Sequence, residues 1–176
     1  MRCHRTITLI LLVAALTAVA PAEVQTAIPS PEAYFGFRPG ADRELVHWRD
    51  MVTYFSAMEK NCDRIKVMHM GPSTMGNPFL VLIISSPANL ANLEALQKIN
   101  KTLSDPRGID EQTLEAYVQQ GRAVICQSMG LHSSEVGGTQ AAPGIVHALV
   151  SGQDRQTRRI LDNVLSETAL IERHLS

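Results

Sequence analysis

The spacing of apolar residues predicts a series of helices and strands over residues 43–163. Residues 43–60 carry apolar side chains at helical intervals, which predicts an amphipathic helix with a broad apolar face. Residues 64–70 alternate in character, residues 79–84 are almost wholly apolar, and glycines and prolines separate the two runs. This arrangement predicts an antiparallel hairpin whose second strand is deeply buried.

Capping residues mark the helices that follow the hairpin. Ser86 is suited to cap a helix and Pro87 to occupy its first position, so we expect one long helix that ends near Asp105. Asp110 is placed to cap a further short helix, and Gly121 is expected to stop it. Short stretches of turn-forming residues therefore separate the predicted elements.

The last predicted elements form a strand, a loop and two helices. We expect a buried strand at residues 122–128, and a helix from about 139 to 150 in which Pro143 is tolerated because it lies near the first turn. A final helix is expected over residues 153–165, with Asp154 as its cap. A loop after a buried strand is where open α/β sheets gather their ligands.

That loop carries the main candidate for chemistry, the pair His132 and Glu135. An imidazole and a carboxylate are ordinary zinc ligands, and a spacing of three brings two side chains to one side of a turn. A catalytic zinc usually has three protein ligands and one open position. This pair supplies two ligands, and the third remains to be identified. The alternative is that both residues are incidental surface groups on a loop.

Other potential ligands have simpler interpretations. His147 on the following helix is expected to lie at the edge of the core, with a role as third ligand as the alternative. His47 and Asp50 are expected to form a surface pair on a helix flank. Cys62 and Cys126 are expected to be two separate buried or half-buried thiols, although an exported protein permits a disulfide.

The amino-terminal residues predict export. Residues 1–22 combine a polar start, an apolar core over residues 7–19, and small residues at Ala20 and Ala22, which together indicate a secretory signal peptide. The apolar run is shorter than the roughly 20 residues that a bilayer requires. We therefore expect a secreted or periplasmic protein without membrane attachment after cleavage, which begins with an irregular arm at residues 23–42.

The length and net charge of the chain exclude some classes of function. The chain has 176 residues, which suits one domain, and its net charge of −1 gives no basic surface for phosphate backbones. Nucleic acid is therefore not an expected partner. The sequence also lacks a phosphate-binding glycine-rich loop and a nucleophile elbow.

Residues 32–163 resemble the zinc carboxypeptidase family in the order of their features. The resemblance rests on the first helix and strand, the turn Gly71–Pro78, the apolar strand to Ser85, the long helix, and the buried strand that leads into Met129–Glu135. It implies an α/β fold, a mixed β-sheet with helices on both faces. It also implies that Zn²⁺ is bound by His132 and Glu135, and that the substrate is a peptide or protein with a free carboxyl terminus.

The chain also departs from this family. Gly137 and Gly138 follow the metal pair, where relatives often carry an apolar and then a small residue. Neither the third ligand nor the general-base glutamate has a counterpart. We therefore expect a partial domain at residues 43–163, an aberrant or frayed tail at residues 164–176, and a truncated, inactive fragment. His174 in the tail is a possible substitute ligand.

Two alternatives remain open. A zinc deacylase or amidase on the same scaffold would use the same pair of ligands on a small acylated amino acid. A secreted binding module would keep the fold without catalysis.

Overall fold

The computed structural model describes residues 28–130, 132 and 134–171 of the chain. The expected signal peptide, the first residues of the expected arm, and His174 all lie outside the described residues. Within the described part, no helix is long and apolar enough to cross a membrane.

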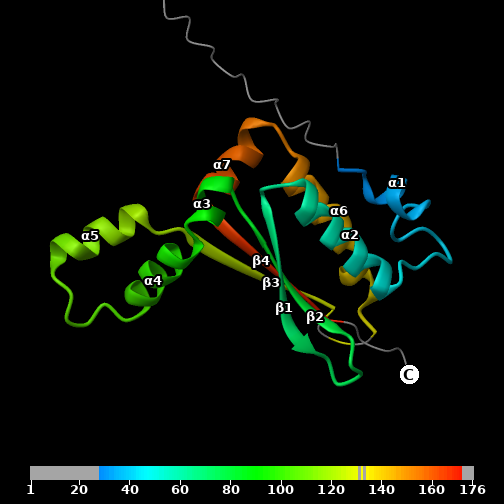
Figure 1. The fold of residues 1–176 in the computed structure, drawn as a ribbon, viewed down its shortest axis with the longest axis horizontal. Helices are drawn as coiled ribbons and strands as arrows, with labels where there is room; N and C mark the ends of the chain where they lie inside the picture. The colour runs from blue at the N-terminus through cyan, green and yellow to red at the C-terminus, as the bar shows by residue number, and fades with distance from the viewer. Residues whose placement is uncertain (1–27, 131, 133, 172–176) are drawn as a thin grey trace, which may run out of the picture.

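The centre of the fold is a mixed four-stranded sheet (Figure 1). Its strands are β1 (Ile65–Pro72), β2 (Pro78–Ile84), β3 (Ala123–Met129) and β4 (Val164–Ile171), in the spatial order β1-β2-β4-β3. Strand β2 is antiparallel to both β1 and β4, whereas β3 runs parallel to β4. The predicted hairpin is therefore confirmed, with Val67 opposite Leu82.

Seven helices accompany the sheet in the described part of the chain. They are α1 (Pro31–Phe35), α2 (Trp48–Asn61), α3 (Pro87–Ala91), α4 (Leu93–Ser104), α5 (Glu111–Gln120), α6 (Val136–Ser151) and α7 (Arg155–Asn163). The predicted caps Ser86, Asp110 and Asp154 each accept a backbone hydrogen bond at a helix start. The long helix predicted after Ser86 is instead two helices, because the chain leaves helical geometry at Asn92.

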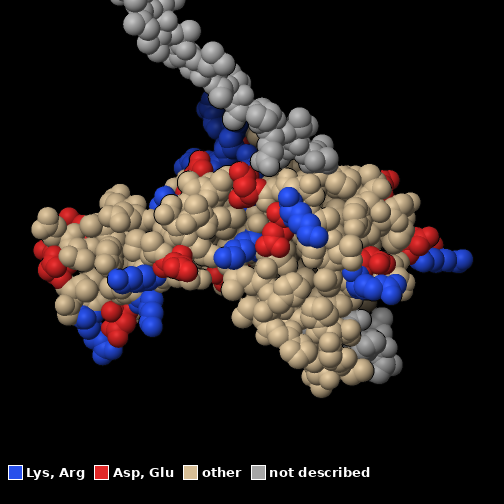
Figure 2. Space-filling view, viewed as in Figure 1, with Lys and Arg blue, Asp and Glu red and all other residues tan. Residues whose placement is uncertain are grey.

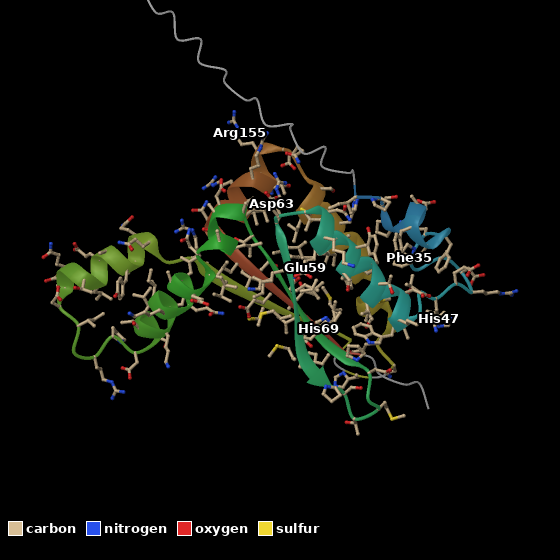
Figure 3. All side chains as sticks on the ribbon, in the orientation of Figure 1. Phe35, His47, Glu59, Asp63, His69 and Arg155 are labelled. Atoms are coloured by element: carbon tan, nitrogen blue, oxygen red, sulfur yellow. The ribbon has the colours of Figure 1, made fainter. Side chains whose placement is uncertain are left out.

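The expected irregular arm contains helix α1. Ser30 caps this helix through its hydroxyl, Pro31 occupies the first position, and Gly36 ends it in a left-handed conformation. The ring of Phe35 contacts that of Tyr54 on α2, with centroids 5.1 Å apart, and the Tyr54 hydroxyl donates to the Pro29 carbonyl at 2.8 Å. The arm is thus held against α2 (Figure 3).

Apolar side chains pack on both faces of the sheet. One core joins α2 and α6 to one face of β1, β2 and β4, and includes Phe55, Leu80 and Val146. A smaller core on the opposite face joins Ile83 and Leu165 to helix α4. The predicted α/β fold, a mixed sheet with helices on both faces, is therefore confirmed.

The prediction of an aberrant or frayed tail from residue 164 is wrong for residues 164–171. These residues form β4, an inner strand of the sheet. Leu170 packs in the core on one face of the sheet, and Leu165 packs in the core on the other. This alternation suits a strand buried on both sides. Strand β4 also supplies the second hydrogen-bonding partner that the buried strand β2 requires.

The prediction of a buried strand at residues 122–128 is correct for the strand but wrong for its burial. The strand forms as β3, but six of its seven residues are exposed. Among the described strands, β3 pairs only with β4 and lies at the edge of the sheet. Helices α4 and α5 extend away from it (Figure 1), so Val124 and Ile125 are 42% and 49% exposed.

The exposed edge leads to a prediction about solubility. Residues 123–129 contain no charge and no proline, and an exposed apolar edge strand is a template for pairing with another chain. We expect the protein to self-associate, and Ile125→Lys to reduce this association by placing a charge on the edge strand. Light scattering over a range of protein concentrations measures it.

The matched control is Val118→Lys on α5. Val118 is 60% exposed but lies on a helix, so its replacement should leave self-association unchanged. Equal effects of the two substitutions, or a monomeric parent protein at high concentration, would contradict an edge-pairing mechanism.

Charged side chains are unevenly spread over the surface. Acidic and basic groups lie close together over the helices, whereas the lobe that holds the end of the β1–β2 hairpin shows neither (Figure 2). Residues 67–93 contain no Asp, Glu, Lys or Arg, and Met70 and Met75 are exposed. Because β2 begins opposite the end of β4, this uncharged lobe lies at the carboxyl end of β4.

Candidate metal site

A tight turn connects strand β3 to helix α6 and carries the predicted pair. Strand β3 ends at Met129, and Gly130 follows with a φ of +71°, in the left-handed region that favours glycine. A Cβ at Gly130 would overlap Oγ1 of Thr139 on α6, and a Cβ at Gly138 would lie 3.5 Å from the Gly130 nitrogen. Glycine at position 130 therefore allows the strand end and the helix to approach closely, whereas the contact at Gly138 would be an ordinary van der Waals distance.

The structure brings His132 and Glu135 together in this turn. Nδ1 of His132 lies 2.7 Å from Oε1 of Glu135, and the His132 backbone N–H donates to Oε2 at 3.1 Å. The backbone N–H of Glu135 donates to the His132 carbonyl at 3.0 Å. Both side chains are more than half exposed to solvent, so an ion from solution can reach them.

The donor atoms of this pair fit two positions of a zinc site. Ligand atoms about 2.1 Å from a tetrahedral ion are separated by about 3.4 Å, so the 2.7 Å contact must open slightly to admit an ion. Glu135 is the residue that precedes the first turn of α6, where the helix dipole stabilises a negative charge. The pair can therefore offer a neutral imidazole nitrogen and a carboxylate oxygen to the same cation.

No third ligand joins the pair in the part of the chain that the structure describes. The described residues contain no group of three or more His, Cys, Asp or Glu side chains suited to a metal ion. His147 follows Glu135 by twelve residues in α6, a rise of about 18 Å along a helix. Its Nε2 lies 3.3 Å from the Ile28 carbonyl, and the side chain is partly buried at the edge of the core.

The other histidines lie on separate elements. His47 precedes the first turn of α2, and His69 lies on β1 (Figure 3). Asp50, the predicted neighbour of His47, lies 3.9 Å from the Arg49 guanidinium in an exposed ion pair. His174, considered as a substitute zinc ligand, lies outside the described residues.

Cys62 and Cys126, the cysteines in the described part of the chain, are separate free thiols. Cys62 is half-buried, and burial is the main cause that raises its pKa. Cys126 is exposed rather than buried, because β3 lies at the sheet edge. Its thiol donates to Oε2 of Glu167 at 3.3 Å, and this hydrogen bond is the main cause that raises its pKa. Both shifts favour the thiol over the thiolate.

Gln140 in α6 connects this helix to the segment before α2, a contact that the sequence did not predict. Its side-chain Oε1 accepts a hydrogen bond from the Val46 N–H at 2.9 Å, and its Nε2 donates to the Val46 carbonyl at 3.0 Å. Both residues are buried. The one available signal was a polar residue directly before the mostly small and apolar stretch 141–150, which does not reveal its partner.

Comparison with known proteins identifies the family. The sequence profile of the zinc carboxypeptidase family matches residues 51–165, a range that includes both His132 and Glu135. No curated protein and no solved structure matched the chain. The chain belongs to the zinc carboxypeptidase family, and its mixed sheet and flanking helices agree with that membership.

Proposed function

We propose that this protein is a zinc-dependent carboxypeptidase that hydrolyses peptides from their free carboxyl terminus. The observation that carries the proposal is the 2.7 Å approach of His132 to Glu135 at the carboxyl end of β3, in a chain that belongs to the zinc carboxypeptidase family. A position beyond the carboxyl ends of sheet strands is where α/β folds bind their ligands.

The residues of the turn have distinct roles in this proposal. His132 supplies a ring nitrogen and Glu135 a carboxylate oxygen, while Gly130 lets the turn pack against α6. Zinc, when bound, polarises the substrate carbonyl and lowers the pKa of its water to about 7. Exposure of the pair leaves room for a peptide terminus to approach.

The number of zinc ligands limits the expected peptidase activity. A catalytic zinc normally has three protein ligands, and the described residues supply two at this site. We therefore propose that the 176-residue chain binds zinc weakly and is inactive as a peptidase without a third ligand. Added imidazole, which supplies a free ring nitrogen, is expected to tighten zinc binding.

Zinc titration by calorimetry tests the metal site. We expect one weakly bound ion per chain, and His132→Ala and Glu135→Ala should each weaken binding at least tenfold because one of two ligands is lost. His147→Ala is the control, because His147 lies far along α6 and should not affect affinity. Unchanged affinity in both ligand variants would refute this metal site.

Hydrolysis assays test the substrate class. With zinc and imidazole present, slow cleavage is expected for a peptide with a free carboxyl terminus, because the general-base glutamate of the family has no identified counterpart. The same peptide with a terminal amide, and an N-acyl amino acid, should not be cleaved. Preferential cleavage of the N-acyl amino acid would favour a deacylase. Zinc binding without any hydrolysis, even with imidazole, would favour a binding module.

A further inference from the structure

A pocket of about 520 Å³ lies beside the first turns of α6, the helix that directly follows the candidate metal pair. One wall is formed by residues 39–45, and the other by the first turns of α6, including Val136 and Gly137. These two residues follow Glu135 directly in the chain, so this wall of the pocket begins one residue beyond the candidate metal pair. Its volume is within the usual range for small-molecule sites, about 300–1,000 Å³.

The outer wall of the pocket is held in place by Gln140. The two buried hydrogen bonds between its side chain and the backbone of Val46 connect this wall to α6. Arg43 in the same wall has a φ of +61°, a left-handed conformation that is unusual for a residue other than glycine. The two Gln140 hydrogen bonds therefore hold the end of this segment against α6.

The lining favours an apolar ligand. Its small and apolar members are Pro39, Gly40, Ala41, Leu45, Val136, Gly137 and Ala141. Its charged members are Asp42, Arg43 and Glu44, and the exposed side chains of Asp42 and Arg43 form a loose ion pair at 3.8 Å. Because charges of both signs lie close together, the wall has little preference for a charged ligand.

We propose that this pocket is a subsite for an apolar side chain of the peptide substrate, on a residue one to three positions before the cleaved bond. The inference rests on the proposed peptidase function. An extended peptide advances about 3.3–3.6 Å per residue, and Gly137 is two residues beyond Glu135 on the helix. A substrate with its terminal bond at the metal can therefore reach the pocket within a few residues.

Gly137→Leu tests the subsite by filling it. A Cβ at Gly137 would meet no atom within 4 Å, and leucine is a better helix former than glycine, so the variant should fold. Gly144→Leu is the matched control, because Gly144 also faces open space, two turns along the same helix, but does not line the pocket. Leu45→Asp, at an exposed position in the outer wall, is a second test of the lining.

Fluorescence anisotropy with labelled peptides measures the binding. Peptides with free carboxyl termini are compared in pairs, with and without zinc, and each pair carries leucine or glycine at one of the three residues before the last. At one of these positions the parent protein should bind the leucine peptide at least tenfold more tightly. Gly137→Leu should reduce this preference to below twofold, Leu45→Asp should lower it, and Gly144→Leu should retain it.

The outcomes separate the subsite from the proposed function. A leucine preference that depends on Gly137 but persists without zinc supports the subsite even if zinc binding fails. No preference in the parent protein, no peptide binding, or an undiminished preference in Gly137→Leu overturns the subsite, whatever the zinc titration shows.

Discussion

Replacing Asn89 with alanine is expected to lower the free energy of unfolding by about 3 kcal/mol. Asn89 is buried at 5% exposure. Its Nδ2 donates to Oγ of Ser85 at 3.0 Å and to the carbonyls of Leu161 and Asp162 at 3.0 and 3.1 Å, and its Oδ1 accepts from Nε of Arg122 at 3.1 Å. Its removal leaves several of these buried or half-buried polar groups with fewer partners.

The reason for a large effect is the number of segments that meet at this amide. Ser85 directly follows β2, Leu161 and Asp162 belong to the last turn of α7 before β4, and Arg122 precedes β3. The side chain of Asn89 thus connects the end of β2 with the starts of β3 and β4. Its loss should destabilise their alignment together with the individual hydrogen bonds.

Urea unfolding followed by circular dichroism measures the loss. Asn92→Ala is the matched control, since the Asn92 amide donates to the Ala88 carbonyl at an exposed position, and we expect a change below about 1 kcal/mol. A loss for Asn89→Ala no larger than that of the control would show that the connected segments do not depend on this side chain.

The elements that the sequence predicted correctly have local causes. Ser86, Asp110 and Asp154 each cap a helix within three residues of their own position. The turn at residues 71–78 joins two strands that are neighbours in both sequence and space. The pairing of His132 with Glu135 is also local, because three residues separate them in one turn.

The features that the sequence did not predict depend on distant contacts. Strand β4 forms because β2 and β3 pair with its two edges. The residues of β4 alone do not reveal these partners. The exposure of β3 depends on which elements cover the sheet. Helix α6 begins at Val136 instead of near residue 139, so Pro143 lies well inside it and removes the backbone hydrogen bond to the carbonyl of Thr139.

Gly130→Ala is expected to weaken zinc binding at least tenfold and to lower the free energy of unfolding by about 2 kcal/mol. Alanine is disfavoured at a φ of +71°, and its Cβ would overlap Oγ1 of Thr139. The turn must therefore move away from α6, which alters the positions of His132 and Glu135. Calorimetric zinc titration and urea unfolding measure the two effects.

Two further substitutions separate backbone strain from steric overlap at this turn. Gly76→Ala introduces alanine at a similar φ of +80° but into open space, so it should lower stability without changing zinc affinity. Thr139→Ala removes the hydroxyl that the new Cβ would meet, and the double variant with Gly130→Ala should recover part of the lost affinity. Full recovery would show that the overlap alone displaces the ligands, whereas strictly additive losses would show that Gly130 acts only through its backbone conformation.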